Sequence, residues 1–167
     1  MRIPDQRRSR HAGFSIVEAL VALVVLSIGM LGIAALYVES LRAGRSAIYR
    51  TQAVNLASDM ADRIRANRNA RESYDIQAGD APPGLQRCAP PDNAVCSPQQ
   101  LADDDVTRWL TAITEQLPAG PGGQATGTVT VTTPAAAPQT RQYSIEVSWF
   151  EPGEGNQAMT YMLNMQI

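Results

Sequence analysis

The chain has 167 residues, enough for one domain with an appendage. Its formal net charge is −2, it contains no lysine, and four of its 14 arginines lie in the first 13 residues. The remainder is therefore acidic, which argues against general binding to the phosphates of nucleic acids.

The sequence offers little for an enzyme. Its only histidine, His11, lies in the basic leader, so no histidine serves as a general base or metal ligand in the rest of the chain. Gly-x-Ser-x-Gly and phosphate-binding motifs are missing as well. We expect no catalytic residue, no cofactor and no metal; catalysis by carboxylates alone is the enzyme hypothesis that stays open.

Residues 19–38 form an apolar run broken only by Ser27, Gly29, Gly32 and Tyr37. As a helix this run is about 30 Å long, the thickness of a bilayer core. The preceding arginines predict that its N-terminal end is cytoplasmic and that the following body is exported. Because no small-x-small cleavage site clearly ends the run, we expect the helix to be retained.

The helical pattern continues to about residue 69, with one apolar stripe on an otherwise polar segment. The stripe consists of Tyr49, Ala53, Leu56, Met60 and Ile64. Asp59 and Arg63 form a favourable i, i+4 pair on another face. The arginines at 63, 65, 68 and 71 are interleaved with acids and indicate a solvated helix face, with DNA binding as the weaker alternative.

The stretch GFSIVE, residues 13–18, places an acid at the start of the apolar helix. A carboxylate near a membrane boundary is costly and usually marks function. The basic leader, Gly13-Phe14, Glu18 and the long apolar helix together resemble the class III signal of type IV pilins and type II secretion pseudopilins. The resemblance implies that a prepilin peptidase cuts between Gly13 and Phe14, that Phe14 becomes N-methylated, and that Glu18 acts in assembly.

Cleavage would create a positive α-amino group at Phe14, four residues before Glu18. Glu18 can pair with this group on a neighbouring subunit, which would align two apolar helices, or it can complement its own helix N-terminus. Many pilins have a proline later in the apolar helix, but this chain has none there. Gly29 and Gly32 are the weak points for local unwinding in a filament, or they permit close helix packing.

Residues 75–98 are rich in Pro, Gly and Asp and predict a loop. Cys88 and Cys96 lie in it, and their spacing fits neither a Cys-x-x-Cys motif nor a zinc knuckle. In an oxidising compartment they would form a disulfide that closes a small loop; two free thiols are the alternative.

A short second helix is predicted after this loop. Ser97 and Gln100 fit a capping box with Pro98 at the first helical position. Asp103–Asp105 are an alternative start, and we interpret them as a charged first turn rather than a calcium loop, whose spacing they do not match. The apolar face consists of Val106, Trp109, Leu110, Ile113 and Leu117.

The last third alternates with period two and predicts three antiparallel strands. The expected fold is α+β, a type IV pilin fold with a long N-terminal helix packed on a small antiparallel sheet. We divide the chain into a leader (1–13), a transmembrane and assembly helix (14–39), its amphipathic continuation (40–72), a connecting region with the Cys loop and short helix (73–125), and the sheet (126–167).

Three further segments resemble the type IV pilus modification protein family, PilV. They are SAIYRTQAVNLASDMADRIRANRNA after the apolar helix, the Trp109–Gly123 segment and the strand YSIEVSW. The resemblance implies a minor pilin, a structural subunit of a priming and tip complex that promotes pilus assembly. A type II secretion pseudopilin is the alternative.

The resemblance also implies where the chain acts and with which partners. The precursor would span the inner membrane once, with a periplasmic body, and would then enter the extracellular pilus. The implied partners are other minor pilins, the major pilin, prepilin peptidase and a tip adhesin.

Overall fold

The computed structural model describes residues 13–88, 92, 94–120, 123–151 and 157–167. The chain divides into two compact units, Met1–Gly44 and Arg45–Ile167. One helix, α1 (Ile16–Ala66), contributes its first part to one unit and its second part to the other. The predicted single helix is confirmed, although it begins two residues later than expected and gives way after residue 66 to a 3₁₀ segment, η1 (Arg68–Tyr74).

The first part of α1 is exposed along its whole length. Every residue from 13 to 45 is exposed, including the whole apolar run. α1 has the length and composition needed to cross a membrane, and its most apolar stretch of 18 residues has a mean hydropathy of 2.7 with none of it buried. An exposed helix that is apolar on all sides requires lipid or other helices around it.

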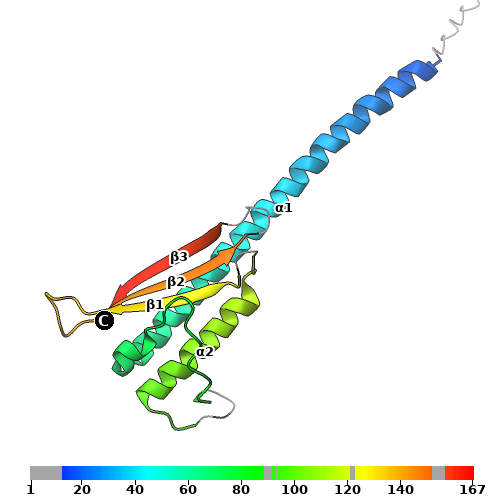
Figure 1. The fold of residues 1–167 in the computed structure, drawn as a ribbon. Helices are drawn as coiled ribbons and strands as arrows, with labels where there is room; N and C mark the ends of the chain where they lie inside the picture. Colours follow the sequence, from blue (N-terminus) through cyan, green and yellow to red (C-terminus); the bar gives the residue numbers. More distant parts are fainter. Residues whose placement is uncertain (1–12, 89–91, 93, 121–122, 152–156) are drawn as a thin grey trace, which may run out of the picture. The chain divides into compact units, whose positions relative to one another are not determined.

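The second unit has its own hydrophobic core. In it the later part of α1, helix α2 (Pro98–Gln116) and a three-stranded antiparallel sheet pack together (Figure 1). The strands β1 (Thr126–Thr132), β2 (Gln142–Phe150) and β3 (Ala158–Gln166) follow the spatial order β1-β2-β3. α1 contributes its predicted stripe to this core: Ala53, Leu56, Met60 and Ile64 are buried together with Ala57 and Ala61, and Tyr49 packs against the core partly buried. The expected fold, a long helix with a small antiparallel sheet, is confirmed.

Alternation along the strands separates a core face from a solvent face. In β2 the inward residues Tyr143, Ile145, Val147 and Trp149 are all at most 2% exposed, and the residues between them are partly exposed. Gly127 of β1 lies against α2, where a Cβ atom would overlap the Trp109 ring and the Ile113 methyl group. Only glycine therefore permits this approach between strand and helix.

α2 begins as predicted but not with the predicted charges. Ser97 accepts a hydrogen bond from the Gln100 amide, and the Gln100 side chain accepts one from the Ser97 amide, which completes the capping box. The first turn contains no acid, so the interpretation of Asp103–Asp105 as a charged first turn is wrong. The capping box starts the helix at Pro98, and this places the three aspartates in the second turn, with Asp104 and Asp105 buried.

Candidate functional site

The structure describes the three residues expected to act in processing and assembly. Glu18 lies in the first turn of α1, and Phe14, two residues before the helix, is 76% exposed. A Cβ atom at Gly13 would meet nothing within 4 Å, and the backbone there is not in the left-handed region. The fold of the chain thus places no demand for glycine at position 13. The arginines of the leader and His11 lie outside the described residues.

The apolar surface that follows Glu18 has no unpaired hydroxyl group in its middle. Ser27, the one hydroxyl in the middle of the run, donates its hydrogen bond to the Leu23 carbonyl at 2.7 Å, which satisfies it within the helix. Gly29 and Gly32 have open space around them, and α1 is regular through both. Local unwinding in a filament stays a prediction, and these glycines leave room for a second helix to approach closely.

In the second unit, a polar cluster that is buried at Tyr74 and Asp105 and exposed at Asp59 connects the end of α1 to α2. Arg63 donates to Asp59 and to Asp105, each at 2.8 Å, and the Tyr74 hydroxyl donates to the other Asp105 oxygen at 2.8 Å. Burial lowers the pKa of the Arg63 guanidinium, but the two carboxylates outweigh burial and raise it. Burial, reinforced by Asp105, raises the pKa of Tyr74 well above its usual value, so its hydroxyl remains a donor. The predicted Asp59–Arg63 pair is confirmed as part of this cluster.

Asp104 binds the other side of α2 to the preceding loop. One of its oxygens accepts the backbone amides of Gln86 and Arg87 at 2.8 and 2.9 Å, and the other pairs with Arg108 at 2.7 Å. Burial raises the pKa of the Asp104 carboxyl, but these three donors outweigh it and hold the pKa below its usual value. The charge of Asp104 is therefore structural, because it holds the loop against α2.

The same loop contains the Cys88–Cys96 disulfide, which confirms that prediction. Its closure leaves no free cysteine among the described residues. The disulfide and the hydrogen bonds to Asp104 thus hold this loop at two points, and the loop residues 77–88 and 94–97 that the structure describes form no strand or helix.

Two members of the arginine cluster, Arg63 and Arg65, form ion pairs within the protein. Arg63 pairs with two aspartates and Arg65 pairs with Asp62 at 2.7 Å. Arg71 has a backbone φ of 48°, a left-handed conformation that is unusual for a non-glycine residue, and its carbonyl accepts from the Tyr143 hydroxyl. Within the described ranges, no group of three or more His, Cys, Asp or Glu side chains is placed to hold a metal ion.

Sequence reasoning did not find the contacts of Asn67, Tyr74, Asp104 and Asp105. The Asn67 amide donates to the Pro98 carbonyl at 2.7 Å and so joins the end of α1 to the start of α2. Apart from the Asp104–Arg108 pair, most of these contacts join residues far apart in the chain, and periodicity does not reveal such pairs. The sequence offered only a weak signal for them: three consecutive aspartates, Asp103–Asp105, in a chain whose arginines cluster between residues 63 and 71.

Comparison with family models gives two matches. Residues 35–107 match the Tt1218-like model, described as type IV pilin Tt1218, and residues 8–34 match the prokaryotic N-terminal methylation motif. The second match spans Gly13, Phe14 and Glu18. The chain is thus similar to a type IV pilin over residues 35–107 and to the N-terminal methylation motif over residues 8–34, and a motif of this kind implies prepilin peptidase processing and assembly with other pilins. Neither the curated proteins nor the solved structures include a match to the chain.

Proposed function

We propose that this chain, with its type IV pilin domain and N-terminal methylation motif, is a minor pilin of the PilV kind. In this role it is a non-enzymatic subunit of a complex that primes assembly of a type IV pilus and remains near its tip. The single observation that carries the proposal is the exposed apolar helix, headed by Gly13-Phe14 and Glu18, continuing into a body with its own core. The body of such a subunit buries its own hydrophobic core, whereas the exposed apolar helix needs lipid or neighbouring helices around it.

The proposed sequence of events starts at the membrane. The precursor spans the inner membrane with its body in the periplasm, and prepilin peptidase cuts between Gly13 and Phe14 and methylates Phe14. Because Gly13 meets no packing or backbone constraint in the chain itself, a requirement for glycine there comes from the peptidase. The oxidising periplasm then suits the Cys88–Cys96 disulfide.

Glu18 acts after processing. In lipid, its carboxylate and the methylated amine of Phe14 favour each other over isolation, so a subunit that enters the filament can bind the amine of its neighbour. The exposed apolar residues that follow then exchange lipid for neighbouring helices. Other minor pilins, the major pilin and a tip adhesin are the partners of this step.

Mass spectrometry of the mature N-terminus tests processing. We expect the chain from its native host to begin at Phe14 with one added methyl group, and the Gly13→Val variant to retain its leader. Ser15→Ala, a conservative change at an exposed neighbouring position, is the control and should be cut normally. A normally cut Gly13→Val variant would contradict the cleavage assignment.

Filaments test the assembly role. Glu18→Ala should be cut but absent from sheared pili, whereas Glu39→Ala, at an exposed acid in the same helix, should be incorporated. Deletion of the protein should reduce surface pili and leave type II protein secretion unchanged. Loss of secretion with normal piliation would instead identify a pseudopilin.

A further inference from the structure

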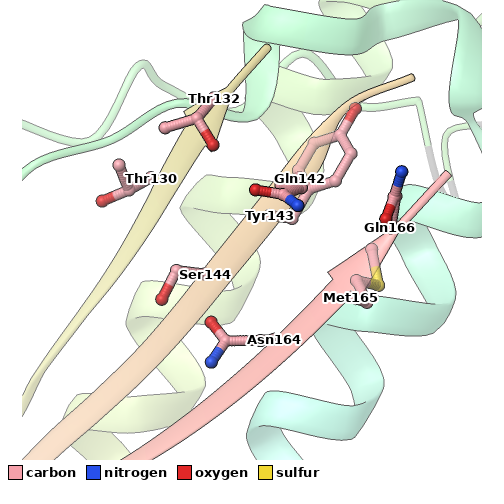
Figure 2. A pocket seen from close by; sticks show the side chains of 8 residues that line it. All are labelled: Thr130, Thr132, Gln142, Tyr143, Ser144, Asn164, Met165 and Gln166. Carbon is pink, nitrogen blue, oxygen red and sulfur yellow. The ribbon is translucent and has the colours of Figure 1, made fainter. Parts of the chain in front are cut away.

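The outer face of the sheet carries a small, regular array of neutral polar side chains. Facing residues on the three strands form two rows that cross the sheet in register. The first row is Thr130, Ser144 and Asn164, and the second is Thr132, Gln142 and Gln166. These six residues, which we call the hydroxyl–amide grid, line an open hollow of about 470 Å³ (Figure 2).

The side chains of the grid are accessible, and most of them make no hydrogen bond among the described residues. Tyr143 and Met165 belong to the same strands but pack on the core side, so they border the hollow through their backbone. Within the described part of the chain, the one side-chain hydrogen bond of a grid residue joins the Gln166 amide to the Thr140 hydroxyl at 3.1 Å. The grid thus presents hydroxyl and amide groups that both donate and accept.

The charges around the grid oppose an anionic ligand. The next row along the sheet contains Glu146, whose carboxylate accepts from Ser148 and makes no ion pair among the described residues. Beyond the other end lies Arg141, and Glu72 pairs with it at 2.6 Å. This pairing holds the pKa of the Glu72 carboxyl below its usual value, so the two charges cancel at neutral pH. No free cation therefore faces the hollow from the residues described.

From this arrangement we infer that the hydroxyl–amide grid is a binding site for a neutral, polyhydroxylated ligand, a segment of uncharged oligosaccharide. Each hydroxyl of a saccharide donates and accepts, as do the groups of the grid. Strand spacing makes the grid about 10 Å by about 7 Å, comparable with a disaccharide. The grid has no aromatic side chain for stacking, so we expect binding in the millimolar range. The inference is independent of the pilus assignment.

Nuclear magnetic resonance of the full chain in a zwitterionic micelle tests the inference, because a detergent with a sugar head group would compete. The probes are maltohexaose, cellohexaose and chitohexaose, with a hyaluronan hexasaccharide as the anionic comparison. We expect at least one neutral probe to shift the side-chain amides of Asn164 and Gln142 in a saturable way, and the anionic probe to bind more weakly. No saturable shift with any neutral probe would overturn the inference.

Variants locate the site. Thr130→Val with Asn164→Leu removes polar groups at both ends of one row and should weaken binding at least about tenfold. Gln142→Ala changes an exposed side chain without risk to the core and should also weaken binding. Thr128→Val, on the same face one row outside the grid, is the matched control and should bind like the wild type. The assignment would be refuted if all three variants bound the ligand like the wild type, or if the chemical shift changes were spread over the whole surface.

Discussion

The two parts of α1 differ in what covers them. Residues 19–38 are apolar on all sides and exposed, whereas residues 45–66 are mostly polar and yet bury a stripe against α2 and the sheet. Apolarity alone therefore does not decide burial within one chain. A partner decides it: the second part has one within the chain, and the first part needs lipid or other helices.

This difference can be measured because both tryptophans report on one unit. Trp109 and Trp149, the only two in the sequence, are 1% and 2% exposed in the core of the second unit. Their fluorescence during unfolding in micelles reports the stability of that unit. Variants in the two parts of α1 should then give different results.

The largest contrast is expected between two truncations in the same helix. Ile64→Ala creates a cavity at a fully buried position and should lower the free energy of unfolding by about 4 kcal/mol. Leu26→Ala, at a position 57% exposed, should leave the tryptophan transition unchanged. Similar losses for both variants would show that the two parts of α1 are not independent.

Glycine substitutions give a second contrast. Gly127→Val should lower the free energy of unfolding by about 3 kcal/mol, because the new side chain overlaps Trp109 and Ile113. Gly32→Val meets open space and should leave the second unit intact, although it should impair filament assembly if close helix packing occurs there. Thermal melts followed by fluorescence, with pili counted in parallel, separate these effects.

The disulfide should contribute less than the core positions. Replacing both Cys88 and Cys96 by Ser should cost about 2–3 kcal/mol, since an open loop gains conformational freedom in the unfolded chain. A reducing agent should lower the stability of the wild type by the same amount and leave the double variant unaffected. Unequal effects would show that the serines disturb the loop itself.

Asp104→Asn should have the smallest effect, about 2 kcal/mol at pH 7, since it removes the charge that binds Arg108 and two amides. The folded pKa of Asp104 lies below the usual 3.8, so its charge stabilises the fold above that pH and the stability is lost as pH falls through the folded value. The variant should therefore lose less stability in acid than the wild type. Asp62→Asn, at a side chain 76% exposed, is the control and should match the wild type.

Much of the local structure could be predicted from the sequence. The spacing of Met60 and Ile64, the capping box at Ser97 and the alternation along residues 143–149 each depend on neighbours within a few positions, so the pattern carries the information. The predicted processing signal is local for the same reason, because a peptidase would recognise a short segment. The structural roles of Asp104 and Asp105 were not predictable in this way, since one binds residues 17 and 18 positions away and the other pairs with Arg63, 42 positions away.

By itself, the sequence predicted a processing signal, an apolar helix and an α+β body. Only the tertiary structure decided which polar groups hold that body together and which remain free. The three aspartates from 103 to 105 and the glycine at 127 illustrate the reason. A carboxylate or a missing side chain acquires its role from what packs against it, and that neighbour is supplied by the fold rather than by the adjacent sequence.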